Sequence, residues 1–115
     1  MFNKLRTVIY HLNDLPNAKA WYTQLTGIKP YFDEVFYVGF NINGCELGLD
    51  PDNTNIQNGN NSIVYWSVDN IKTAVEKAES IGASLVSSIQ NVGGNIEVAI
   101  IRDPFGNCIG LITGT

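Results

Sequence analysis

Two side chains stand out as candidates for acid–base or ligand chemistry. Glu46 is a carboxylate between Cys45 and Leu47 in an otherwise apolar strand pattern, and His11 is the only histidine. A carboxylate in such a place needs a partner, or it faces solvent or a ligand, where it can anchor a cation or act as a general base. An imidazole can bind a ligand or exchange a proton near neutral pH. The alternatives are a solvated or paired carboxylate and a strand-end histidine satisfied by backbone.

The other reactive residue types point to structural roles. With one histidine, a histidine-rich metal site is excluded, and a His11–Glu46 metal pair would lack further ligands. Cys45 and Cys108 make no disulfide framework, and nothing basic neighbours them in the sequence to activate a thiol, so we expect them to pack. Asp103 and Asn107, within "DPFGN", are expected to build their own turn through Asx hydrogen bonds.

The composition predicts one folded domain and argues against two classes of partner. The chain has 115 residues, 44% of them hydrophobic, and a net charge of −4 with only seven Lys and Arg. Such a surface repels nucleic acid and anionic membranes, so neither is an expected partner. No apolar run reaches the roughly 18–20 residues of a membrane span. The first residues, broken by Asn, Lys, Arg, His and Asp, do not resemble a signal peptide, and we expect a cytoplasmic protein.

The elements that must position these residues occur twice. "TVIYHLNDL" (7–15) matches "IVYWSVDNI" (63–71), each a period-2 strand ending in a helix-capping residue, Asp14 or Asn70. A helical apolar face follows each, and Gly27 and Gly82 stand where a left-handed C-terminal residue is wanted.

Strands and hairpin turns complete each repeat. An Asn43-Gly44 turn follows the first helix, and a Gly93-Gly94 turn and "DPFGN" follow the second. We therefore predict an α+β fold and a single domain of two tandem βαβββ modules, at 1–50 and 62–115. The polar, Asn-rich stretch 51–61 is the expected linker between them.

The segments "HLNDLPNAKAWYTQLTGIKP" and "DPFGNCIGL", within this repeat, resemble the vicinal oxygen chelate superfamily of glyoxalases, bleomycin resistance proteins and extradiol dioxygenases. The resemblance covers essentially the whole chain. It implies that each module forms a curved sheet, that the two modules make a cleft for a ligand or metal, and that the protein is a homodimer.

The resemblance also locates the family's metal ligands, one on the first and one on the last strand of each module. The first-strand positions, seven residues before each capping residue, are Thr7 and Ile63; the last-strand positions are Gly48 and Gly110. None of the four can bind a metal usefully. We therefore expect no metal and no other cofactor, and we expect the missing side chain of Gly110 to leave room in the cleft.

Strand alternation assigns the remaining faces. The helix-facing set is apolar throughout: Val8, Tyr10, Leu12, Leu47, Leu49, Val64, Trp66, Val68, Ile109 and Leu111. The cleft side then carries a mixed set: Ile9, His11, Glu46, Asp50, Tyr65, Ser67, Cys108 and Ile112. The pattern leaves the facing of Trp21, Phe36, Tyr37 and Phe40 open.

Three hypotheses follow for function, and whether the protein is an enzyme stays open. The first is a metal-independent binding protein of the bleomycin-resistance type, whose ligand, aromatic or cationic, contacts Thr7, His11, Glu46, Gly48, Ile63, Tyr65 and Gly110. The second is a metal-free isomerase or lyase that uses Glu46 or His11 as acid or base. The third is a small dimeric domain of a larger assembly. A metal-dependent lyase or dioxygenase is disfavoured by the lost ligands.

Overall fold

The predicted α+β fold is confirmed. The computed structural model describes residues 1–52, 54 and 62–114, and it divides into two compact units, Met1–Ile56 and Gln57–Thr115. Each unit contains one helix and four strands in the predicted order, strand, helix and three strands. Most of the predicted linker, 51–61, lies outside the described residues.

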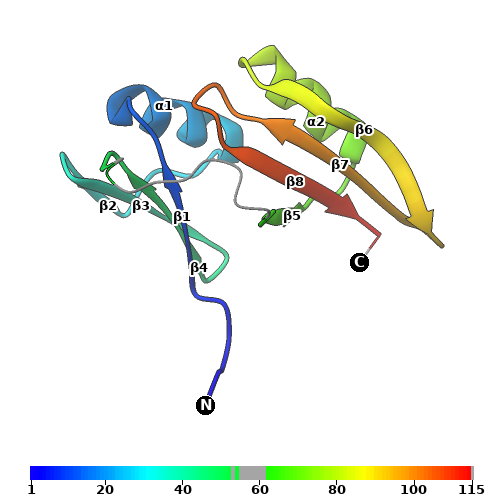
Figure 1. Ribbon diagram of the computed structural model, residues 1–115, viewed down its shortest axis with the longest axis horizontal. Coiled ribbons are helices and arrows are strands. Elements are labelled where there is room, and N and C mark those ends of the chain that lie inside the picture. The colour runs from blue at the N-terminus through cyan, green and yellow to red at the C-terminus, as the bar shows by residue number, and fades with distance from the viewer. Residues whose placement is uncertain (53, 55–61, 115) are drawn as a thin grey trace. The chain divides into compact units, whose positions relative to one another are not determined.

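The first unit is a four-stranded sheet with one helix on it. Its elements, in chain order, are β1 (Thr7–His11), α1 (Leu15–Thr26), β2 (Phe32–Glu34), β3 (Tyr37–Ile42) and β4 (Cys45–Asp50). The strand order is β1-β4-β3-β2, with β1 parallel to β4 and the other pairs antiparallel. Figure 1 shows β1, in blue, beside β4 although most of the unit separates them in sequence. The last strand thus joins the first.

The second unit repeats this topology. Its elements are β5 (Tyr65–Ser67), α2 (Ile71–Ser80), β6 (Ser84–Gly93), β7 (Ile96–Arg102) and β8 (Cys108–Thr113), with strand order β5-β8-β7-β6. The pairing of β6 with β7 is interrupted by register shifts, which bend a strand. Figure 1 shows this bend in β6.

The sequence signals for helix ends and turns act as expected, with one correction. The hairpin between β6 and β7 turns at Gly94 and Asn95 and not at the predicted Gly93-Gly94, because Gly93 still pairs with Ile96. The Asp14 carboxylate accepts a hydrogen bond from Asn17 N at 3.2 Å, and the Asn70 amide oxygen accepts one from Thr73 N at 3.0 Å. Such caps contribute about 1 kcal/mol each. Gly27 ends α1 with a φ of 73°. Both residues of the Asn43-Gly44 turn also have positive φ, which a two-residue hairpin requires.

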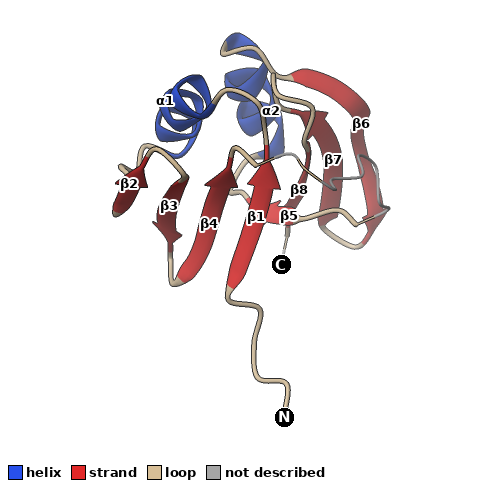
Figure 2. Ribbon diagram, turned by 60° about the vertical axis from the view of Figure 1, so that its left-hand side comes forward, coloured by secondary structure: helices blue, strands red, loops and turns tan. Residues whose placement is uncertain are grey.

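One face of each sheet carries the core. In the first unit Tyr10, Leu12, Leu47 and Leu49 are buried, and the Tyr10 ring lies 5.8 Å from that of Tyr22 on α1. In the second unit Ile109 and Leu111 are buried in the same way. Figure 2 shows α1 against one face of the first sheet. Because side chains alternate along a strand, the remaining ones lie on the opposite face, which no helix among the described residues of this unit covers and which is called the open face below. None of the helices in the described part of the chain is long and apolar enough to cross a membrane.

Candidate functional site

Two tyrosine rings lie on bare backbone at the open face of the first sheet. Gly39 of β3 pairs with Gly48 of β4, so the sheet has no side chain at that point. A Cβ added to Gly48 would lie 2.5 Å from Cζ and 2.9 Å from Cε1 of Tyr37. A Cβ added to Gly39 would lie 3.3 Å from Cε1 of Tyr31. The glycine pair therefore makes the space in which both rings rest.

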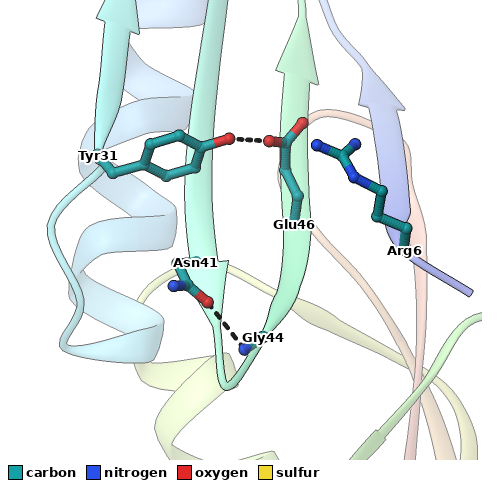
Figure 3. A pocket seen from close by; sticks show the side chains of 5 residues that line it. All are labelled: Arg6, Tyr31, Asn41, Gly44 and Glu46. Carbon is teal, nitrogen blue, oxygen red and sulfur yellow. Dashed lines mark hydrogen bonds between the residues drawn. The ribbon is translucent and has the colours of Figure 1, made fainter.

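Both tyrosine hydroxyls donate to one carboxylate. Tyr37 Oη donates a hydrogen bond of 2.6 Å to Glu46 Oε2, and Tyr31 Oη donates to Oε1 (Figure 3). Each oxygen of the carboxylate is thus held by a phenol from a different segment of the chain. Because a carboxylate has about four acceptor positions, Glu46 can still accept hydrogen bonds from a ligand.

The phenol of Tyr37 is a stable donor at neutral pH. Burial of the ring, and secondarily the negative charge of Asp50, raise the pKa of Tyr37 above its ordinary value near 10, while the Arg6 charge acts in the opposite sense. The hydroxyl therefore keeps its proton near neutral pH and donates a hydrogen bond to Glu46.

A small cavity borders this carboxylate. It has a volume of about 190 Å³ and is lined by Arg6, Tyr31, Asn41, Gly44 and Glu46. Figure 3 shows the Arg6 guanidinium directed toward the Glu46 carboxylate, on the side opposite Tyr31. The Asn41 amide oxygen accepts a hydrogen bond of 2.8 Å from Gly44 N in the hairpin turn. The lining of the cavity thus combines a cation, Arg6, an anion, Glu46, and amide groups of Asn41 and Gly44.

His11 lies at the other end of the same face. The register pairs Thr7 with Glu46 and His11 with Asp50, so four residues, or roughly 13 Å of strand, separate His11 from Glu46. The His11 Nδ1 atom is 2.9 Å from the Asp52 carbonyl oxygen. The hypothetical His11–Glu46 metal pair is therefore wrong, because the strand register keeps the two side chains apart.

Strand register also settles the open aromatic residues. Tyr37 lies on the open face, whereas Phe40 is fully buried opposite Leu47 on the helix-covered face. Trp21 is buried on α1 against Tyr22, with ring centroids 4.8 Å apart, and Phe36 is exposed. Only Tyr37 of this group contributes to the site.

In the second unit a tyrosine again covers the glycine. A Cβ added to Gly110 would lie 2.6–2.9 Å from ring atoms of Tyr65, which pairs with Gly110 across β5 and β8. The expected open space at Gly110 is therefore wrong, because the exposed Tyr65 ring fills it. Ile63 precedes β5 and is 41% exposed.

The Asx turn is confirmed, and one cysteine has an unexpected neighbour. The buried Asp103 Oδ1 accepts hydrogen bonds from Phe105 N at 2.9 Å and Asn107 N at 2.7 Å. Both cysteines are free. The Arg102 guanidinium lies 3.9 Å from Cys108 Sγ. The two residues are six positions apart in the sequence, and the pairing of β7 with β8 brings them together.

The metal ion that active members of the resembling family hold does not fit these residues. Thr7, Ile63, Gly48 and Gly110 supply one hydroxyl between them, and tyrosine rings occupy the space where side chains at both glycines would start. Within residues 1–52, 54 and 62–114, no group of three or more His, Cys, Asp or Glu side chains could hold a metal ion. The family's ligand positions therefore supply too few donors here for a metal-dependent reaction.

Sequence reasoning missed Tyr31, Arg6 and Asn41. The sequence contained a signal for Asn41, because a two-residue Asn43-Gly44 turn pairs Ile42 with Cys45 and so places Asn41 opposite Glu46. Strand alternation then places Tyr37 on the same face as Asn41. Arg6 and Tyr31 lie outside the strands, where no alternation rule applies.

Solved structures share this fold over nearly their whole length. One is a glyoxalase/bleomycin resistance protein/dioxygenase family enzyme from Burkholderia phytofirmans PsJN, with a TM-score of 0.82 and 17% identity, covering 96% of this chain and 98% of that one. Another is a genomically encoded fosfomycin resistance protein from Listeria monocytogenes, with a TM-score of 0.82 and 15% identity, covering 100% and 96%. A glyoxalase/bleomycin resistance protein from Albidiferax ferrireducens T118 has a TM-score of 0.76 and 20% identity, covering 95% and 98%. At these identities the likeness shows the fold alone.

Together, the repeated βαβββ topology and these structures define the glyoxalase fold. The model of the Glyoxalase/Bleomycin resistance protein/Dioxygenase superfamily matches residues 4–111, and the chain belongs to that superfamily. No curated protein matches the sequence.

Proposed function

We propose that this protein binds a small organic molecule, without a metal at the family's ligand positions, on the open face of its first sheet. The observation that carries the proposal is the Glu46 carboxylate, which Tyr31 and Tyr37 hold from two sides next to a cavity of about 190 Å³. A preorganised acceptor loses little further freedom when a ligand binds, so more of the contact energy appears as affinity.

Thr7, His11 and Gly48, on the same sheet as Glu46, belong to this proposal as secondary contacts. Ile63, Tyr65 and Gly110 stay predicted ligand contacts within the second unit, considered by itself. Thr7 is the best supported, since it pairs directly with Glu46 and accepts a 2.8 Å hydrogen bond from Arg6. In the other unit, the exposed Tyr65 ring offers an aromatic surface to a flat ligand. A homodimer is part of the same proposal, and light scattering measures it directly.

An acid–base enzyme is the second candidate. Glu46 is partly accessible and His11 is not fully buried, so either side chain could reach a substrate. They cannot act on the same atom, because roughly 13 Å of strand separates them. A reaction would therefore rest on one of the two with a donor such as a tyrosine hydroxyl.

Glu46→Gln and His11→Ala distinguish these candidates. The ligand panel consists of aromatic cations and small metabolites, screened by thermal melting, since binding to the folded state raises the midpoint. In a binding protein Glu46→Gln should weaken affinity for the panel compound by about 1–3 kcal/mol, the value of a lost charged hydrogen bond. In an enzyme, the variant that removes the acid–base group, Glu46→Gln or His11→Ala, should reduce turnover by two or more orders of magnitude while the protein stays folded.

Two controls sharpen the result. Glu97→Gln on β7 serves as the matched carboxylate-to-amide change in the other unit, and His11→Ala as the second change on the same sheet. If no compound raises the midpoint, or if Glu46→Gln and Glu97→Gln weaken binding equally, the proposed site is wrong and the domain serves another role, such as assembly.

A further inference from the structure

The cavity beside Glu46 carries one charge of each sign. Arg6 supplies the cation and Glu46 the anion, and Tyr31, Asn41 and Gly44 complete the wall. A ligand bearing only a positive charge would meet the Arg6 guanidinium, and a ligand bearing only a negative charge would meet the Glu46 carboxylate. A ligand with both charges can place each one against its opposite.

Hydrogen bonds orient the polar groups on the Glu46 side and on the Arg6 side of the cavity. Glu46 accepts one bond on each oxygen from the two tyrosines, so its remaining acceptor positions suit an ammonium group. On the other side, the guanidinium of Arg6 has five N–H donors, one of which goes to Thr7 Oγ1 at 2.8 Å. Gly44 N donates a hydrogen bond to Asn41 Oδ1. The Asn41 amide nitrogen, which is a donor, therefore points away from the Gly44 backbone (Figure 3). Carboxylates are the groups that such donors recognise.

The volume limits the ligand. Pockets for drug-sized molecules measure roughly 300–1,000 Å³, and this cavity is about 190 Å³. The ligand portion that enters it is therefore small, of the size of a free amino acid.

We propose that this site binds a small zwitterion of the amino-acid class, with its ammonium group on Glu46 and Tyr31 and its carboxylate on Arg6 and Asn41. The proposal rests on the proposed function and specifies its ligand. It differs from the sequence-based expectation of an aromatic or cationic ligand, because Arg6 was not placed in the site by the sequence.

The test uses sets of three probes that share one hydrocarbon group and differ in their charged groups. L-valine carries both charges, isobutylamine carries only the ammonium group, and 3-methylbutanoate carries only the carboxylate. Further sets are built on other α- and ω-amino acids. Each probe is titrated into the full ¹⁵N-labelled protein, and the amide shifts of Asn41, Gly44 and Glu46 are followed. We expect at least one zwitterion to move these amides with a dissociation constant at least tenfold below that of either single-charge partner.

Two neutralising variants give opposite changes. Arg6→Gln removes the cation from an exposed residue, so it should weaken zwitterion binding tenfold or more and improve the amine. Glu46→Gln should weaken zwitterion binding likewise and improve the carboxylate. Lys4→Gln, a matched loss of charge outside the cavity lining, should leave all three probes unchanged.

Three outcomes would overturn the proposal: an amine that binds as tightly as its zwitterion, shifts confined to residues outside the cavity, or no shift with any set. The proposed function fails separately. If the zwitterions do not bind but an aromatic cation or another metabolite moves the same amides, the site stands and only its ligand class is wrong. If nothing moves them, both are wrong.

Discussion

The ring of Tyr37 occupies the space in which a side chain at Gly48 would begin. An added Cβ would lie 2.5 Å from Tyr37 Cζ, closer than real Cβ contacts come. In the superfamily resemblance this position belongs to a metal ligand, so the glycine is the residue that both removes the ligand and admits the ring. Tyr65 and Gly110 have the same relationship in the second unit. A tyrosine ring over a glycine at the ligand position is therefore a feature of both repeats.

Gly48→Ala should destabilise the protein and disturb the site together. The new methyl group must displace the Tyr37 ring, at a cost of about 1–3 kcal/mol for an overpacked position. Because Tyr37 donates to Glu46, the hydrogen bond should weaken as well. Urea unfolding measures the first effect, and the NMR shift of the Tyr37 ring measures the second.

Gly39→Ala is the matched control, since its Cβ would approach Tyr31 only to 3.3 Å, a contact that a small ring shift relieves. Its cost should be clearly smaller. In the Gly48→Ala/Tyr37→Ala double variant the clash is gone, so the two changes should be strongly non-additive. Additive costs would show that the ring does not rest on Gly48.

Divalent metals should not stabilise the protein. We expect the melting midpoint of EDTA-treated protein to stay unchanged with Ni²⁺, Zn²⁺, Mn²⁺ or Fe²⁺, because Thr7, Gly48, Ile63 and Gly110 offer a single hydroxyl as donor. A rise of the midpoint with one ion that Glu46→Gln abolishes would contradict this and would revive a metal-dependent activity.

The fold could be predicted from the sequence because its signals are local. Capping by Asp14 and Asn70, left-handed Gly27 and the Asn43-Gly44 turn each act within a few residues, and their repetition fixed the topology. Strand alternation likewise assigned the buried faces, because period 2 leaves no other choice once one residue is placed.

The parts of the site that Tyr31 and Arg6 supply could not be predicted, because these residues meet Glu46 from segments distant in the sequence and outside the strands. Glu46 was identified from its type and place, but Tyr31 reaches it from a turn before β2, and Arg6 from the chain before β1. The space at Gly110 was misjudged for the same reason. A glycine removes its own side chain, but only the packing shows which neighbour fills the space.

The Asp103 turn should be a substantial source of stability in the second unit. Asp103→Ala leaves the amide groups of Phe105 and Asn107 without the carboxylate oxygen that accepts from both, so we expect a loss of roughly 2–3 kcal/mol in urea unfolding. Asn107→Ala removes the 3.2 Å side-chain bond to Asp103 but keeps the backbone N–H that donates to Asp103 Oδ1, so it should cost less than about 1 kcal/mol. Equal losses from the two variants would assign the stability to Asn107 instead.

Stability should fall in alkaline solution through Tyr37. Burial, and then the charge of Asp50, raise the pKa of Tyr37 in the folded protein above the value near 10 of the unfolded chain. Between these two values the unfolded state has lost the phenol proton and the folded state still holds it, so the free energy of unfolding decreases as the pH rises. This contribution is fully present below pH 10 and is lost as the pH passes through the folded-state pKa.

Tyr37→Phe removes that proton from both states. The difference in unfolding free energy between the wild type and Tyr37→Phe should therefore be constant up to about pH 9 and should shift in favour of the variant above pH 10. Urea unfolding at pH 8, 9, 10 and 11 measures it. Tyr65→Phe keeps Tyr37 and should decline as the wild type does, whereas parallel curves for wild type and Tyr37→Phe would show that the environment of Tyr37 does not favour its protonated form.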